Sequence, residues 1–99
     1  MAQPIYKSYF LKAKEPWYQL SKADQEALLK KLGAAFEKVG GKAIVRCDAN
    51  WSSDAWQGFG VEMFPDMEAV QQYTKSLNDL NWFRYIEGIS ALGTEMPSA

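Results

Sequence analysis

The chain has 99 residues, with 11 basic and 12 acidic side chains and a formal net charge of −1 at pH 7. This length corresponds to a single domain over residues 1–99, which buries about 60–70% of the surface of the unfolded chain. The balanced charge argues against a nucleic-acid-binding protein, because such proteins usually present a basic face. No apolar run approaches the ~20 residues that a membrane-spanning helix needs, and Met1 to Pro4 do not begin a signal peptide. We therefore expect a cytoplasmic protein without nucleic acid or a membrane among its partners.

The sequence contains no histidine and one cysteine, Cys47. Histidine is the commonest general base near pH 7 and the commonest ligand of metals and haem, and one thiolate does not build a zinc site. We therefore expect no metal, haem or other cofactor. Aromatic residues make up 14% of the chain, and they either fill a small core or line an aromatic pocket.

The first part of the chain predicts a strand followed by a helix. Pro4 to Ala13 carries β-forming residues on both alternating rows, and Pro16 follows it. Ser21 to Val39 has apolar residues at helical spacing, and Ser21 with Asp24 resembles a capping box. The two glycines that follow Val39 provide the left-handed end of this helix.

The second part predicts a hairpin, a helix and a final strand. Lys42 to Ala49 and Ala55 to Phe64 form the hairpin strands around a polar turn. A helix begins at Pro65 and Asp66 and continues with apolar residues at spacings of three and four. Phe83 to Leu92 predicts the last strand, before a polar tail to Ala99.

The order βαββαβ predicts a ferredoxin-like α+β fold, a four-stranded antiparallel sheet with two helices on one face. The helices leave the other face of the sheet open. In the third strand, Phe59, Val61 and Met63 form one apolar row, while Trp56 and the alternate residues from Gly58 to Phe64 form the other. An aromatic row that faces water is a candidate partner site. We therefore expect a homodimer with the two sheets face to face.

Short motifs over most of the chain suggest a family. They are Pro16-Trp17, Leu20-Ser21, Arg46-Cys47-Asp48-Ala49, the helix from Asp66 to Leu77, and Trp82-Phe83 with Tyr85. With these motifs the chain resembles the dimeric α+β barrel superfamily and, within it, the darcynin-type domain. Two positions depart from the family pattern, which has acidic residues where Asn50 and Gly58 stand in this chain. The resemblance implies the fold and the dimer, and it supplies no reaction.

The wider superfamily implies several chemistries. Its members include cofactor-independent monooxygenases of polyketide biosynthesis, polyketide cyclases, lactone isomerases and haem-degrading enzymes. The haem branch and many cyclases use histidine, which this chain lacks. In the cofactor-independent oxygenases an aromatic substrate carries much of the chemistry, and Trp, Asn, Arg and Tyr in a closed pocket suffice. This chain has that set of residue types.

The predicted hairpin places polar residues on one face. If the strands pair around the middle of the turn, Asp48 lies opposite Gly58 and Arg46 opposite Gly60. A glycine opposite a charged side chain leaves space above the sheet, so we expect a polar pocket edged by Arg46, Asp48 and Glu62.

Two arrangements stay open for this pocket. In the first, Trp56 lies beside it and stacks on an aromatic ligand whose acidic oxygen meets Arg46. In the second, Arg46 forms an ion pair with Asp48 or Glu62 in the dimer interface, and a ligand can bind only between the helices and the sheet, near Tyr73.

The candidate residues divide by role, and each also has a structural interpretation as a core, turn or ion-pair residue. The candidate catalytic residues are Asp48, Glu62 and Tyr85. The candidate substrate-binding residues are Arg46, Asn50, Trp56, Tyr6 and Tyr73.

Three functions stay open. The first is a metal- and cofactor-independent enzyme, of monooxygenase or cyclase/isomerase type, that acts on a hydrophobic aromatic metabolite. The second is a non-catalytic small-molecule-binding protein, and the third is a structural or accessory dimer. Without histidine, catalysis needs a desolvated carboxylate, a tyrosine or a substrate that activates itself. The sequence therefore does not decide whether the chain is an enzyme.

Overall fold

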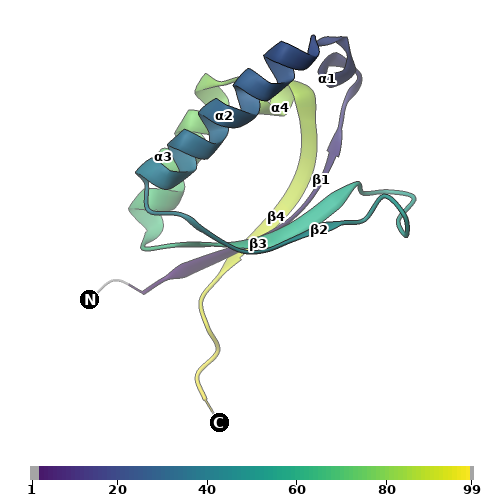
Figure 1. Cartoon of the computed structure of the whole chain (residues 1–99). Helices are drawn as coiled ribbons and strands as arrows, with labels where there is room; N and C mark the ends of the chain where they lie inside the picture. Colours follow the sequence, from purple (N-terminus) through teal and green to yellow (C-terminus); the bar gives the residue numbers. More distant parts are fainter. Residues whose placement is uncertain (1–2, 99) are drawn as a thin grey trace.

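A computed structural model describes residues 3–98, and Met1, Ala2 and Ala99 lie outside the described residues. Four antiparallel strands form one sheet in the order β2-β3-β1-β4. Helices α2 and α3 lie together on one side of this curved sheet (Figure 1). The elements in chain order are β1 (Ile5–Ala13), α1 (Glu15–Gln19), α2 (Lys22–Lys38), β2 (Lys42–Asp48), β3 (Gly58–Phe64), α3 (Met67–Asp79), α4 (Trp82–Tyr85) and β4 (Ile86–Gly93). This arrangement confirms the predicted ferredoxin-like α+β fold.

Both long helices begin at a capping side chain. The Ser21 hydroxyl accepts a hydrogen bond from the Asp24 backbone N–H at 3.1 Å, and the Asp66 carboxylate accepts one from Ala69 at 2.8 Å. Each cap satisfies an N–H group that has no partner inside the helix. After α2 the chain turns at Gly40, whose φ of +79° lies in the left-handed region that glycine adopts without strain. The predicted start and end of this helix are therefore confirmed.

The core lies where α2 and α3 pack on the end of β3. Phe36, Phe64 and Tyr73 form a cluster with ring centroids 5.3–5.6 Å apart, and Phe64 is completely buried. Aromatic pairs at these separations add to the free energy gained from burying their area. The cluster fixes the two helices over one end of the sheet.

The start of β3 differs from the prediction. Residues 55–57 were expected to belong to the strand, but the Ser53 hydroxyl accepts hydrogen bonds from the backbone N–H groups of Ala55 (3.1 Å) and Trp56 (2.9 Å). This side-chain turn competes with sheet pairing, so the strand begins only at Gly58.

The region before β4 also differs. Phe83 to Tyr85 were predicted as strand but belong to the short helix α4. Asn81 adopts a left-handed conformation (φ 57°), and its carbonyl accepts a hydrogen bond from Arg84 N–H at 3.0 Å. Asparagine tolerates this conformation better than most residues, so it turns the chain into one helical turn. The short helix α1, with Pro16 in its first turn, was not predicted either.

The face of the sheet away from the helices carries the apolar row predicted from strand parity. We call it the open face. Every second residue of each strand lies on it, among them Tyr6, Phe10, Val45, Phe59, Val61, Met63 and Ile89. Phe10 is 41% exposed and Phe59 is 39% exposed. None of the helices formed by residues 3–98 is long and apolar enough to cross a membrane.

Candidate functional site

A cavity of about 570 Å³ lies between the helices and the sheet. Each long helix lines it with residues spaced i, i+3, i+4 and i+7, which fall on one helix face. From α2 these are Leu29, Leu32, Gly33 and Phe36, and from α3 they are Val70, Tyr73, Thr74 and Leu77. The walls are therefore mostly apolar, as in most small-molecule sites.

Small, exposed residues stand along the open side of the cavity. Gly33 is the clearest case, since a Cβ atom added there has no other atom within 4 Å. Thr74 occupies the equivalent place on α3. On the sheet side, Gly88 and Ser90 lie below the cavity, and Trp82 and Phe83 of α4 line it as well.

One part of the cavity is charged. Lys7 on β1 lies directly opposite Glu62 on β3 in the register of the sheet, so both side chains point to the helix side. Directly opposite residues have Cβ atoms about 4.5–5.5 Å apart. Arg46 on β2 lies opposite Gly60, two residues before Glu62 on β3. The strands thus bring two cations and one carboxylate to the same lining.

Glu62 is buried, with 8% of its surface exposed. Within residues 3–98, the ion pairs within 4.0 Å are Lys12 with Glu87 and Lys75 with Asp79, so neither Lys7 nor Arg46 is that close to Glu62. Burial raises the pKa of Glu62, and the charges of Lys7 and Arg46 oppose this rise. No described residue donates a hydrogen bond to the Glu62 carboxylate, and no fully buried side-chain oxygen of the described residues lacks a partner, so the carboxylate oxygens reach the open space of the cavity.

Lys7 and the neighbouring tyrosines feel the same low-dielectric surroundings. Burial lowers the pKa of Lys7, and the charge of Glu62 opposes this. The Lys7 Nζ atom lies 5.7 Å from the ring centroid of Tyr73, within reach of a cation–π interaction. Burial raises the pKa of both Tyr9 and Tyr73, with a further rise from the charge of Glu62. Both phenols are thus neutral hydrogen-bond donors at pH 7.

The three charged residues that line the cavity differ in how much of their surface is exposed. Arg46 is exposed, Lys7 is half-buried and Glu62 is buried. Arg46 therefore lies at the mouth and Glu62 deepest. Such an arrangement can hold a ring against the apolar walls, bind an anionic group near the mouth and present a carboxylate to the part of the ligand between them.

Three of the residues predicted from sequence meet at this cavity: Arg46, Glu62 and Tyr73. The hairpin register is confirmed, since Asp48 pairs with Gly58 and Arg46 with Gly60. The free space expected at Gly60 is absent, because an added Cβ would lie 2.5 Å from the Val45 carbonyl oxygen and 2.7 Å from the Tyr9 hydroxyl.

The turn residues and Trp56 lie elsewhere. The Asp48 carboxylate is exposed and accepts hydrogen bonds from the Asn50 backbone N–H and side-chain amide, each at 2.9 Å, so both residues stabilise the turn. Trp56 packs on Phe10, with ring centroids 6.1 Å apart, and Lys12 lies over its ring. The turn at Ser53 directs Trp56 to the open face, so it does not share the pocket with Arg46.

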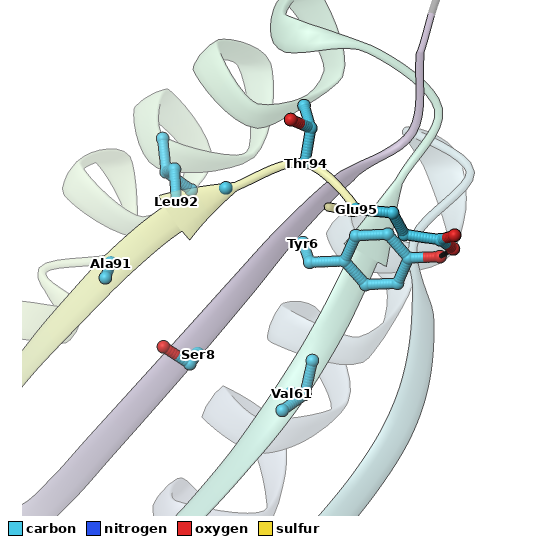
Figure 2. A pocket seen from close by; sticks show the side chains of 8 residues that line it. Tyr6, Ser8, Val61, Ala91, Leu92, Thr94 and Glu95 are labelled. Atoms are coloured by element: carbon cyan, nitrogen blue, oxygen red, sulfur yellow. Dashed lines mark hydrogen bonds between the residues drawn. The ribbon is translucent and has the colours of Figure 1, made fainter. Parts of the chain in front are cut away.

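Tyr6 and Tyr85 also lie outside the cavity lining. Tyr6 lines a second hollow, of about 430 Å³, on the open face (Figure 2). Its hydroxyl donates a hydrogen bond to the Glu95 carboxylate at 2.6 Å. Tyr85 ends α4 and is half-buried, and its carbonyl accepts a hydrogen bond from Lys14 N–H at 2.8 Å.

Sequence reasoning missed Lys7 and Gly33 at this site. Lys7 lies in an apolar strand whose two rows both carry aromatic residues, so parity did not show which row faces the helices. Its register partner Glu62 is the signal that identifies the row. Gly33 lies within an otherwise regular apolar stripe of a helix, where glycine costs about 1 kcal/mol relative to alanine. That cost is the signal that the position needs space.

No family model matches the chain, and no curated protein matches it in sequence. Among solved structures, a chlorite dismutase variant from Candidatus Nitrospira defluvii has a TM-score of 0.77 at 9% identity, with 99% of this chain and 42% of that chain covered. A protein of unknown function from Rhodopseudomonas palustris has a TM-score of 0.67 at 14% identity, with 99% and 86% covered. SnoaB, a cofactor-independent oxygenase from Streptomyces nogalater, has a TM-score of 0.52 at 12% identity, with 98% and 97% covered.

The chain spans less than half the length of the chlorite dismutase chains that it matches. Identities this low show the fold and leave activity open. The resemblance to the darcynin-type domain stays a prediction. The chain therefore has a ferredoxin-like α+β fold, which it shares with these solved structures.

Proposed function

We propose that this chain is a single-domain homodimeric protein that binds a hydrophobic aromatic metabolite in the cavity between its helices and its sheet, and acts on it without a metal or cofactor. The observation that carries the proposal is the cavity itself, with apolar walls and one charged part. The fold shared with SnoaB, a cofactor-independent oxygenase, supports the class of function. Binding without chemistry is the second candidate, because it needs the same cavity.

The lining indicates the form of the ligand. A ring fits against Leu32, Val70 and Leu77, where burial of apolar area provides the binding free energy. An anionic oxygen fits near Arg46 and Lys7, where a charge-assisted hydrogen bond contributes about 1.5–3 kcal/mol. Arg46 and Lys7 outnumber the single carboxylate of Glu62, so a ligand with one negative charge balances the site.

The open face supports the homodimer. Phe10, Phe59 and Ile89 expose an apolar surface on the side of the sheet away from α2 and α3. A second copy offers the same surface, and a twofold axis makes the two faces self-complementary. The cavity lies on the opposite side of each sheet, so both protomers of such a dimer keep an accessible site.

Binding is tested with hydrocinnamate, an aromatic monocarboxylate, and with hydrocinnamyl alcohol as its uncharged counterpart. Isothermal titration calorimetry is expected to show binding of the acid and at least about tenfold weaker binding of the alcohol. Gly33→Phe fills the cavity from α2 and is expected to abolish binding. The matched control, Gly33→Ala, adds only a Cβ atom where no other atom lies within 4 Å, and keeps the affinity.

Two results contradict the proposal. One is the absence of binding by the wild-type protein to either compound or to larger aromatic acids. The other is unchanged binding by Gly33→Phe in a protein that remains folded, because the ligand then lies outside this cavity.

A further inference from the structure

The cavity contains a combination of side chains that ligand binding alone does not require. A site that only holds an aromatic anion needs apolar walls and a cation. This one also holds the carboxylate of Glu62, a residue that is 8% exposed, and no described residue forms an ion pair within 4.0 Å or a hydrogen bond with it. A carboxylate that loses most of its water without gaining a bonded partner destabilises the folded protein, so its place in the cavity calls for a function.

The geometry gives Glu62 a neighbour suited to one chemistry. Lys7 lies directly opposite Glu62 across the β1–β3 ladder, so the ammonium and the carboxylate reach into the same space from adjacent strands. A ligand atom between them has a proton acceptor on one side and a cationic hydrogen-bond donor on the other. That is the arrangement needed to remove a proton next to a carbonyl group and to stabilise the resulting oxyanion.

We propose that Glu62 is a general base that removes a proton from the carbon next to the carbonyl group of an aromatic α-keto acid or a related enolisable aromatic acid, while Lys7 binds the carbonyl oxygen. This inference rests on the proposed function, because it places the substrate in the same cavity. The exposure order of the three charged groups matches such a substrate. Its carboxylate meets Arg46 at the mouth, its carbonyl oxygen meets Lys7, its acidic C–H group meets Glu62, and its ring lies against the apolar walls.

The step balances without a co-reactant. A carboxylate oxygen of Glu62 accepts the proton from carbon, and the C–H electron pair forms a carbon–carbon double bond. The carbonyl π pair moves to oxygen and gives an enolate, which the Lys7 ammonium stabilises. Return of a proton to oxygen gives the enol, and return to carbon regenerates the ketone. Nothing is oxidised or reduced, so the reaction class is tautomerisation or isomerisation.

The test uses phenylpyruvate, which carries a ring, a carboxylate and an acidic methylene group. In D2O, enolisation exchanges the methylene hydrogens for deuterium, and proton NMR follows the loss of their signal. Wild-type protein is expected to accelerate this exchange over protein-free buffer by about 100-fold or more, the usual range for a positioned general base. Glu62→Gln is expected to return the exchange to the buffer rate while calorimetry still shows binding. Lys7→Met is expected to weaken both binding and exchange.

The matched control is Glu87→Gln. Glu87 lies opposite Lys12 across the β1–β4 ladder, on the other face of the sheet, so it repeats the cross-strand Lys–Glu pairing away from the cavity. This variant is expected to exchange at the wild-type rate. If phenylpyruvate binds but exchanges at the buffer rate, or if Glu62→Gln exchanges like the wild type, the role of Glu62 is overturned and the binding function stands. If neither phenylpyruvate, hydrocinnamate, hydrocinnamyl alcohol nor larger aromatic acids bind, the proposed function itself is overturned, and this inference with it.

Discussion

The Lys7–Glu62 pair makes a prediction about stability that needs no ligand. Burial lowers the pKa of Lys7 and raises the pKa of Glu62, and in each case nearby opposite charge only partly opposes the shift. In the folded protein, the loss of water therefore costs each charge more than its neighbours return. Neutralising either one, by Lys7→Met or Glu62→Gln, is expected to raise the free energy of unfolding at pH 7.

The double variant is expected to gain more than the sum of the two single gains. In each single variant, the remaining charge loses its attraction to the charge that was removed. In the double variant both charges are absent, so this attraction is lost only once. The excess equals the mutual attraction of the pair, about 1–3 kcal/mol for opposite charges at this proximity. For a chain of this size, each kcal/mol corresponds to a Tm shift of about 4–8 °C.

Urea unfolding of the four proteins at fixed protein concentration measures this coupling, provided that their m values agree. The matched cycle uses Lys75 and Asp79, an exposed pair one helical turn apart at 2.8 Å, which is expected to couple by about 0.3–0.5 kcal/mol. A Lys7–Glu62 coupling no larger than that of the exposed pair would refute the placement of both charges in a shared low-dielectric cavity.

Three further predictions concern pH, assembly and the helix cap. Burial raises the pKa of Glu62 above its ordinary 4.5. The contribution of Glu62 to stability is therefore fully present below pH 4.5 and is lost as the pH rises through the folded pKa. The stability gain of Glu62→Gln over wild type should therefore grow from pH 4 to pH 7 in urea titrations, and a gain independent of pH would contradict the assignment. Phe59→Lys places a charge in the open face and should convert a dimer into an 11.2 kDa monomer in light scattering; a wild-type protein that is already monomeric at micromolar concentration would exclude the dimer. Ser21→Ala removes the cap on Asp24 and should cost about 1 kcal/mol in unfolding experiments, and no measurable loss would show that the cap is dispensable.

Local sequence signals were sufficient for most of the fold. Ser21 and Gly40 delimit α2 by capping and left-handed geometry, and both act through the neighbouring backbone alone. The sheet order follows from the βαββαβ connectivity. The short helix α4 could not be predicted in this way, because Trp82, Phe83 and Tyr85 are residue types that also favour strands. Its helical turn depends on the left-handed Asn81, which an asparagine allows but does not require.

The site was harder to predict, because it depends on which row of each strand faces the helices. The pairing of Arg46 with Gly60 followed from the length of the hairpin, and it placed Arg46 and Glu62 correctly on one face. Trp56 was placed wrongly, because a side-chain hydrogen bond to Ser53 ends the strand pattern before that residue. Gly60 offers no space because Tyr9, from a strand far away in sequence, lies across it. Such tertiary contacts are not encoded in the spacing of one strand.

The proposed function depends most on where a ligand binds. The most direct measurement is the set of intermolecular nuclear Overhauser effects between the ring protons of hydrocinnamate and the methyl groups of the protein. The cavity predicts contacts to Leu32, Val70 and Leu77, which line it between α2 and α3. Contacts to Val45 and Val61 on the open face, or no contacts under conditions in which calorimetry shows binding, would contradict it.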